Sequence, residues 1–330
     1  MLKDPKIRTL DVFCGGGGSS WGARAAGAEI VCGIDAWDIA TKTYATNFGP
    51  DTGIHRTLVE TGRLPIVDGL GSIDLILASP ECRSHTCARG NGQRDENSRR
   101  TARYVLRFAR KLKPRWIVIE NVIHMRNWDG FEGLVSEAEA LGYHVRAQVL
   151  DASTFGVPQR RRRLFLICDR EEVPAPVTPP GGAPRSVRSD VVMWEGPWRS
   201  RPLYRAERAD ATIEKAERAI DALGRGTPFL VVYYGSDGGG GWQTIDAPLR
   251  TVTTIDRFGL VTWVDNVPML RMLQPPEIQR AMGFGNEYQL PYGSRRDRIR
   301  LLGNAVCPPV MTAVVTSALG DRGVSAPRAA

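Results

Sequence analysis

The segment Ile7-Arg-Thr-Leu-Asp-Val-Phe13, followed by Cys14-Gly-Gly-Gly-Gly18, decides the fold of this chain of 330 residues. Its apolar residues predict a buried strand, its glycines a tight turn, and Ser20 to Ala26 a helix. Such a turn lets backbone N–H groups approach a ligand closely, where a side chain would clash. Glu29 to Ile34 predicts the next strand, and the acid that follows, Asp35, is placed to bond the hydroxyls of a ribose. The start of the chain therefore predicts a site for a nucleotide-like cofactor, although it lacks the G-x-G-x-x-G spacing of dinucleotide sites.

Short apolar strands alternate with helical stretches throughout the first half, which is typical of a parallel sheet covered by helices. The further strands predicted are residues 74–78, 116–120, 145–150 and 163–168. The further helices run up to residue 44, over 99–112 and over 131–141. We therefore expect an α/β fold with a doubly wound, Rossmann-like sheet.

The composition changes after Asp169. Residues 173–202 are rich in Pro, Gly and Ser and predict a loop, residues 206–223 an amphipathic helix, and residues 230–234 and 249–254 short strands. Near the end, residues 275–282 resemble a capped helix and residues 304–319 an apolar one. We expect a large domain made of residues 1–168 and 263–330, interrupted by a smaller inserted domain of residues 169–262.

The formal net charge of +8 and the isoelectric point near 9.4 favour a polyanionic partner. The charge is clustered at Arg160–Arg163 and in Arg295-Arg-Asp-Arg-Ile-Arg300, and arginine suits phosphates and base edges better than lysine. By itself an excess of positive charge is weak support for a nucleic-acid partner, since many basic proteins never bind nucleic acid. No apolar stretch approaches the roughly 20 residues that span a bilayer, and the first residues lack the apolar core of a signal peptide. We therefore expect a cytoplasmic protein without a membrane partner.

The six cysteines are Cys14, Cys32, Cys82, Cys87, Cys168 and Cys307. None belongs to a C-x-x-C pair, which argues against disulfides and a structural zinc site. A metal site from Cys82, His85 and Cys87 is conceivable, but their spacing is irregular and no fourth ligand follows. We therefore expect no metal, and we expect most of these thiols to be small core residues.

Three groups of reactive or charged side chains follow strand-like segments further along the chain. Cys82 closes Asp74-Leu-Ile-Leu-Ala-Ser-Pro-Glu-Cys82, Glu120 opens Glu120-Asn-Val122, and Gln159 precedes four arginines. A thiol, a carboxyl group and paired arginines at strand ends can attack and hold a heterocyclic base. Taken one at a time, the cysteine would be a buried hydrophobe, the Glu-Asn pair a cap and the arginines a solvated face. Together and in this order they predict an active site.

In order and spacing these segments resemble the DNA (cytosine-5)-methyltransferases, which use S-adenosylmethionine. The resemblance runs from about Leu10 to about Val315 and weakens between Asp169 and Pro248. It implies a methyltransferase catalytic domain with a small target-recognition domain inserted in it. It also implies that Cys82 attacks carbon 6 of cytosine, so that carbon 5 can accept a methyl group.

The resemblance assigns roles to the carboxyl group and the arginines as well. Glu120 would hold or protonate ring nitrogen 3, and Arg163 would contact the base from the other side. Arg161 would lie near the sulfur or a phosphate, whereas Arg160 and Arg162 alternate with these arginines on a strand and should face elsewhere. The predicted catalytic residues are Cys82, Glu120, Arg161 and Arg163.

The cofactor that the resemblance implies is S-adenosylmethionine. Its expected site combines the glycine turn, the end of the second strand, the turn before the nucleophile and the late motif Gly303-Asn-Ala-Val306. The residues predicted to bind it are Phe13, Gly15, Gly17, Asp35, Ala36, Pro80, Asn304 and Ala305. Where many members have a Gly-Asp pair for the adenine edge, this chain has Ile54-His55.

Chemistry at carbon 5 requires the cytosine to be flipped out of duplex DNA. The loop Arg83–Ser98 is expected to close over the DNA, although its composition fits plain surface disorder equally well. The small domain, in which aromatic residues and arginines are interleaved, is expected to read the neighbouring bases. The residues predicted to contact DNA are Arg83, Arg89, Gln159, Arg250, Thr251 and Thr253, although Gln159 could instead fix its loop. The expected partner is double-stranded DNA, bound by a monomer.

The nucleophile segment departs from the family pattern, because typical members carry Pro-Cys-Gln, whereas Glu81 precedes Cys82 here and Arg83 follows it. Other functions therefore stay open. The same chemistry could act on RNA, since members that act on transfer RNA share the core. The chain could also be a catalytically silent nucleic-acid-binding relative, or it could transfer a modified group from an altered cofactor.

Overall fold

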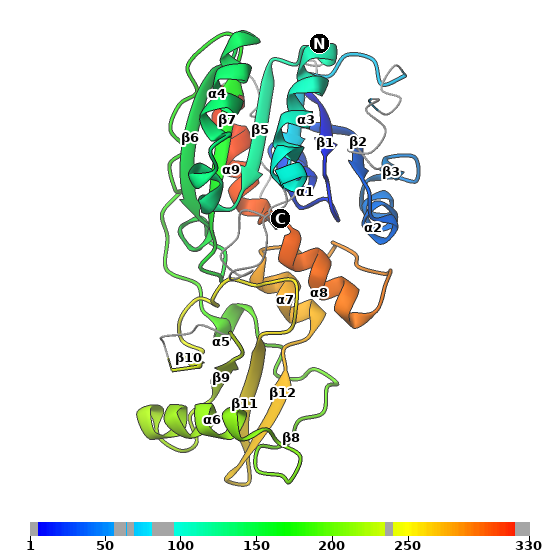
Figure 1. Cartoon of the computed structure of the whole chain (residues 1–330). Helices are drawn as coiled ribbons and strands as arrows, with labels where there is room; N and C mark the ends of the chain where they lie inside the picture. Colours follow the sequence, from blue (N-terminus) through cyan, green and yellow to red (C-terminus); the bar gives the residue numbers. More distant parts are fainter. Residues whose placement is uncertain (1–5, 56–63, 65–68, 81–95, 235–239, 321–330) are drawn as a thin grey trace.

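The computed structural model describes residues 6–55, 64, 69–80, 96–234 and 240–320. A seven-stranded sheet in the order β3-β2-β1-β4-β5-β7-β6 forms the centre of the larger domain (Figure 1). Its strands are β1 (Arg8–Val12), β2 (Glu29–Asp35), β3 (Gly53–His55), β4 (Leu75–Ala78), β5 (Trp116–Asn121), β6 (His144–Asp151) and β7 (Arg162–Asp169). Neighbouring strands are parallel except for β7, which runs antiparallel to both β5 and β6. The predicted α/β class and the Rossmann-like sheet are confirmed.

Helices cover both faces of this sheet, as alternate residues of β4 show. Leu75 and Leu77 share an apolar cluster with α1 (Gly18–Ala25) and α9 (Pro308–Leu319). Ile76 and Ala78 pack instead with α3 (Glu96–Leu112) and α4 (Phe131–Ala140), while α2 (Asp38–Phe48) lies against β2 and β3. Successive strand residues point to opposite faces, so the uninterrupted apolar run of β4 is what a strand covered on both sides requires.

A second, antiparallel sheet in the order β10-β9-β11-β12-β8 forms the smaller domain. Its strands are β8 (Arg201–Pro202), β9 (Phe229–Val232), β10 (Trp242–Thr244), β11 (Phe258–Val264) and β12 (Val267–Met272). α6 (Asp210–Leu223) packs against β9 and β10, and α5 (Val187–Asp190) precedes β8. The domain boundary predicted at residue 262 falls inside β11, and the small sheet continues to Met272.

The strand predicted over residues 249–254 is wrong. Leu249 makes a single parallel bridge with Gln159, and the segment then continues without regular structure to β11. The Thr-Val-Thr-Thr sequence has strand propensity, but side chains of the larger domain bind the backbone of this segment instead of a neighbouring strand.

The terminal helix begins later than predicted and follows a helix that the sequence did not reveal. α9 starts at Pro308, after an extended Cys307, because proline is favoured in the first helical turn. The charged helix α8 (Arg295–Asn304) precedes it, and Ser294 and Asp297 form a reciprocal cap at its start. The capped helix predicted over residues 275–282 is confirmed as α7 (Pro275–Ala281).

The segment Arg295–Leu319 is long and apolar enough, by composition alone, to cross a membrane. It consists of the two helices α8 and α9, and more than half of its most apolar window is buried inside the fold. Val310, Met311 and Val314 of α9 belong to the main apolar cluster, and α9 packs against α1. α9 is therefore a core helix of the larger domain.

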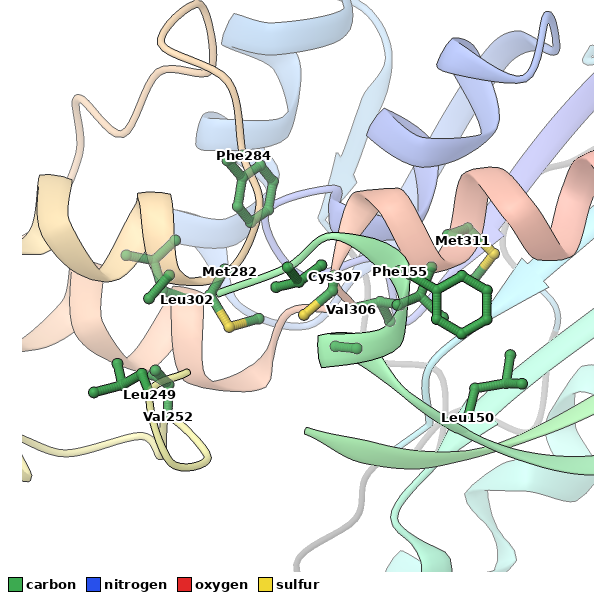
Figure 2. Close-up of a cluster of buried hydrophobic side chains, with 14 of the residues drawn as sticks. Leu150, Phe155, Leu249, Val252, Met282, Phe284, Leu302, Val306, Cys307 and Met311 are labelled. Carbon is green, nitrogen blue, oxygen red and sulfur yellow. The ribbon is translucent and has the colours of Figure 1, made fainter. Parts of the chain in front are cut away.

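Apolar side chains of both domains share one core at their junction (Figure 2). Leu249 and Val252 from the segment before β11 lie beside Met282, which follows α7, and Leu302 of α8. The same cluster continues into the larger domain through Val306, Cys307, Phe155, Leu150 and Met311. Burial of this shared apolar surface holds the two domains together.

A buried ion pair also joins α7 to the small sheet. Glu277 is completely buried, and its carboxylate accepts two hydrogen bonds of 2.7 Å from the guanidinium of Arg271 in β12. It also accepts the backbone N–H groups of Gln274 at 2.8 Å and Met193 at 3.0 Å. These four bonds offset the cost of burying the charge.

Replacing Glu277 by glutamine should lower the free energy of unfolding by about 3 kcal/mol, because Arg271 would keep its charge in a buried site without a counter-charge. Chemical denaturation measures the effect against a matched Glu287→Gln control, in which an exposed acid is changed. Equal stabilities of the two variants would contradict the role assigned to this ion pair.

Candidate active site

β4 and β5 are parallel neighbours, so their carboxyl ends lie at the same edge of the sheet. Figure 1 shows β5 ending at the edge that faces the smaller domain. The side-chain amide of Asn121, the last residue of β5, donates a hydrogen bond of 3.2 Å to the carbonyl of Pro80 beyond β4. Both residues are buried, so the turn that leads to the predicted nucleophile is held against β5. Cys82 itself lies outside the described residues, as do Glu81, Arg83, His85, Cys87 and Arg89. The roles given to them stay predictions.

Glu120 and Arg163 form a buried ion pair at this edge. The Nε atom of Arg163 lies 3.1 Å from Oε1 of Glu120, and the two side chains are only 17% and 8% exposed. The pairing of β5 with β7 sets Asn121 opposite Leu164, which brings Arg163 to the end of β5. Burial raises the pKa of Glu120, and the charges of Arg163 and Arg161 partly counter the rise. The structure thus joins two predicted catalytic groups, and a carboxyl group that holds its proton more firmly than usual suits general-acid chemistry.

The arginine run alternates as predicted. Arg160 and Arg162 are exposed, whereas Arg161 is 3% exposed and Arg163 turns inward to Glu120. Alternation follows from the period of two residues in an extended chain. The prediction that Arg160 and Arg162 face away from the site is confirmed.

Arg161 binds backbone rather than solvent. Its guanidinium donates to the carbonyl oxygens of Val252 at 2.9 Å, Gly303 at 2.8 Å and Ala305 at 3.0 Å. A small pocket lies beside it, lined in part by Arg163 and Cys307. Because this guanidinium is buried and bound to backbone, it does not lie where it could contact a phosphate of nucleic acid, contrary to the prediction.

The turn after β1 has the backbone that its glycines allow. The φ angles are +53° at Gly15 and +92° at Gly17, in the left-handed region where glycine carries no steric penalty. Phe13 adopts a φ of +60°, which is uncommon for a residue with a side chain and typical of functional turns. The carboxylate of Asp35 accepts the N–H of Gly15 and the N–H of Trp37, each at 2.9 Å. Asp35 therefore ties the turn to the end of β2.

The turn also packs against the late motif. A Cβ atom on Gly18 would lie 2.5 Å from the carbonyl oxygen of Val306 and 3.3 Å from the side chain of Ala305. On the other side, a Cβ on Gly15 would meet no described atom within 4 Å. The predicted residues Ala36 and Asn304 are exposed near these two segments. Among the described residues, the space beside Gly15 is open, as a site for a nucleotide-like cofactor requires.

Two aromatic residues at this site were missed by the sequence analysis. Tyr288, from the segment before α8, donates a hydrogen bond of 2.6 Å to the carbonyl of Gly16 and so supports the turn. Trp37 follows β2, and the guanidinium of Arg300 lies 4.4 Å from its ring centre. The position of Trp37 directly after the second strand was a usable signal, whereas Tyr288 reaches the turn only through the fold.

The Ile54-His55 pair, to which the sequence analysis assigned no role, lies at the carboxyl end of β3, beside the end of β2. In the parallel pairing of β2 with β3, Asp35 is opposite His55 and Ile34 is opposite Ile54. The backbone of His55 therefore lies beside Asp35, next to the candidate cofactor site.

Asp11 of β1 is a buried acid that the sequence analysis did not single out. Its Oδ2 atom accepts a 2.8 Å hydrogen bond from Ser20, whose hydroxyl lies 2.7 Å from that of Tyr44. Its Oδ1 atom is buried and has no hydrogen-bond partner within the part of the chain that the structure describes. Burial raises the pKa of Asp11 to about 7; the Ser20 bond counters this rise and the charge of Asp35 adds to it.

The predicted DNA-contacting residues that the structure describes fall into two groups. Gln159 has no exposed surface; its side-chain amide donates to the carbonyl of Ala281 at 3.0 Å and accepts the N–H of Val252 at 2.8 Å. It therefore fixes its loop and offers nothing to DNA in this conformation. Arg250, Thr251 and Thr253 keep partly exposed side chains on the segment that Gln159 holds.

The cysteines within the described ranges behave as core residues. Cys14, Cys32, Cys168 and Cys307 are free and buried, and burial raises the pKa of Cys168 to about 12. No group of three or more His, Cys, Asp or Glu side chains that could hold a metal ion occurs among the residues that the structure describes.

A family model described as C-5 cytosine-specific DNA methylase matches residues 7–319, so this chain belongs to that family. The type II methyltransferase M.HgiDI of Herpetosiphon aurantiacus is 36% identical over 168 residues, which are 50% of this chain and 52% of that protein. M.AgeI of Thalassovita gelatinovora is 33% identical over 170 residues, 48% of this chain and 39% of that protein. The tRNA (cytosine(38)-C(5))-methyltransferase of Homo sapiens is 28% identical over 179 residues, 53% of this chain and 45% of that protein. The matched segments span about half or less of each of these relatives.

Solved structures share the fold over nearly the whole chain. The methyltransferase EhMeth of Entamoeba histolytica superposes with a TM-score of 0.70 at 15% identity, covering 96% of this chain and 98% of that one. A putative DNA modification methyltransferase encoded within an E. coli prophage gives 0.66 at 17% identity, covering 94% and 98%. The resemblance to this methyltransferase fold is therefore confirmed.

The Asp11 network predicts a pH dependence of stability. The folded protein keeps the Asp11 proton up to a pKa of about 7, against an ordinary value of 3.8, so stability falls as the pH rises across this interval. Between about pH 5 and about pH 8 the parent should therefore lose free energy of unfolding. The Asp11→Asn variant should lose less over the same interval, and the difference should be on the order of a few kcal/mol. Thermal and chemical unfolding at both pH values measure this, with the exposed Asp129→Asn as control. An unchanged pH dependence in Asp11→Asn would assign the effect to another group.

Proposed function

We propose that this chain is a DNA (cytosine-5)-methyltransferase that uses S-adenosylmethionine. The observation that carries the proposal is the buried ion pair of Glu120 and Arg163 at the sheet edge, beside the turn at Pro80 that leads to Cys82. The glycine turn after β1 opens at the end of a strand hydrogen-bonded to β4. A nucleophile, a proton-holding carboxyl group and a cofactor site would therefore meet at one edge.

The chemistry follows from these groups. The thiolate of Cys82 would bond to carbon 6 of cytosine, and the electron pair of the 5,6 double bond would become available at carbon 5. Glu120 would hold or donate a proton at nitrogen 3, which draws electron density as the thiolate adds. Carbon 5 then takes a methyl group, and loss of its proton to a base such as ordered water restores the double bond and releases the thiolate.

S-adenosylmethionine, when bound, would supply the methyl group from its sulfonium. Phe13, Gly15, Gly17, Asp35, Ala36, Pro80, Asn304 and Ala305 are the residues we assign to its site. Asp35 would bond the ribose hydroxyls as well as shape the turn, since a carboxylate has about four acceptor positions and two backbone N–H groups occupy part of them.

DNA is the substrate that we favour over RNA. The chain carries a net charge of +8, and type II methyltransferases stand among its relatives. Transfer RNA is the second candidate, because the human relative is a tRNA methyltransferase. The small domain, predicted over residues 169–262, would read the target sequence, with contacts from Arg250, Thr251 and Thr253. We further propose that the protein acts as a cytoplasmic monomer.

Glu120→Gln should lower kcat by about 100-fold or more, because the amide cannot supply the proton at nitrogen 3. Binding of S-adenosylmethionine should stay within about twofold of the parent, since Glu120 lies outside the glycine turn. Single-turnover kinetics and calorimetry measure the two quantities, with the exposed acid of α4, Glu132→Gln, as control. A wild-type rate in Glu120→Gln would remove Glu120 from the mechanism.

The substrate is tested by expressing the protein and its Cys82→Ala variant in cells that lack cytosine methylation. We expect methylcytosine in one short sequence context of the DNA with the parent and none with Cys82→Ala, because the thiolate forms the covalent bond. Sequencing and mass spectrometry of DNA and of transfer RNA read the outcome. Methylcytosine in transfer RNA alone would replace DNA by RNA as substrate. Folded, cofactor-binding protein that modifies neither would support a catalytically silent relative, and an unexpected mass on cytosine would indicate a modified group.

A further inference from the structure

The segment before β11 is fixed to the larger domain at several points. Gln159 accepts the N–H of Val252 at 2.8 Å, and the hydroxyl of Thr251 donates to the carbonyl of Arg160 at 2.8 Å. Arg161 donates to the carbonyl of Val252 at 2.9 Å. We call residues 250–254 the recognition segment, because it carries Arg250, Thr251 and Thr253.

The same arginine holds a second segment. The Nη2 atom of Arg161 donates to the carbonyl oxygens of both Gly303 at 2.8 Å and Ala305 at 3.0 Å, at the end of α8. We call residues 303–305 the cofactor segment, because Asn304 and Ala305 are assigned to the cofactor site. One buried guanidinium therefore bonds to both segments, which lie about fifty residues apart in the sequence.

The two segments also touch directly at Gly303. A Cβ atom there would lie 2.2 Å from the carbonyl oxygen of Thr253, so any side chain would push the segments apart. Glycine at this position and arginine at 161 therefore support the same contact between the segments. The planar guanidinium makes three hydrogen bonds to backbone and so fixes the relative position of the two segments, which the ammonium group of a lysine would not do.

We propose that Arg161 is a positioning residue that joins the recognition segment to the cofactor segment, so that nucleic acid and cofactor change each other's affinity through this contact. The proposal rests on the proposed function for the identity of the two ligands. Arg161 would act through these carbonyl groups, by holding the backbone of one candidate site against the backbone of the other. Linkage then requires that each ligand change the affinity of the other by the same factor.

The first measurement needs no nucleic acid. Amide hydrogen exchange is followed in the recognition and cofactor segments of the full chain, in the parent, Arg161→Lys, Gly303→Ala and a control, Arg162→Lys. Lysine keeps the charge but cannot reach all three carbonyls, so exchange should accelerate in both segments by roughly tenfold. Gly303→Ala should also accelerate exchange in both segments, although Arg161 is present. Arg162→Lys changes an exposed neighbouring residue and should leave exchange in both segments unchanged.

The second measurement is the coupling itself. Affinity for S-adenosylhomocysteine, which cannot transfer a methyl group, is measured by calorimetry with and without short fragments of unmethylated plasmid DNA. We expect DNA to change this affinity several-fold in the parent and in Arg162→Lys, and by less than about twofold in Arg161→Lys and Gly303→Ala. Methyl transfer by Arg161→Lys should show altered KM values for both ligands, with a smaller effect on kcat.

The outcomes separate the two proposals. Exchange that accelerates in one segment only, or coupling that persists in Arg161→Lys, would overturn the positioning role. So would a loss of kcat with both affinities unchanged, because Arg161 would then act on the reacting base. A parent that binds no DNA would instead refute the proposed function, and the exchange experiment would still decide whether Arg161 joins the segments.

Discussion

The candidate site depends on the reversal of one strand. In a parallel sheet, all strands present their carboxyl ends at the same edge, and β7 is the strand of the larger sheet that runs the other way. Its first residues therefore arrive where β5 ends, and Arg163 meets Glu120 there. Because the pair is largely buried, each charge compensates the other, and a shift in the register of β7 against β5 would separate them.

The sequence predicted features that follow from local periodicity. The apolar run of β4 indicated a strand covered on both faces, and the alternation in Arg160–Arg163 indicated which arginines turn inward. The glycine turn after β1 was equally visible, because its backbone needs the left-handed region at Gly15 and Gly17.

Features that depend on distant partners were not predictable. Residues 249–254 looked like a strand, yet Gln159 and Arg161 bind their backbone in place of a neighbouring strand. Helix α8 is mostly charged, and its packing against α7 was not visible in its own sequence. Tyr288 supports a turn more than two hundred and fifty residues earlier in the chain, and only the folded chain brings them together. The backbone groups of Ala281 and Val252 that Gln159 binds, and the carbonyl oxygens that Arg161 binds, likewise leave no mark in the sequence.

The shared core at the junction has a mechanical consequence. Leu249 and Val252 are buried in one apolar cluster with Leu302 and Met282, so swinging the domains apart would expose this surface to water (Figure 2). Such opening costs free energy in proportion to the apolar area, whereas bending of surface loops exposes little of it. The junction therefore resists opening, and nucleic acid acted on in the proposed way would itself have to deform to bring one of its bases to the sheet edge.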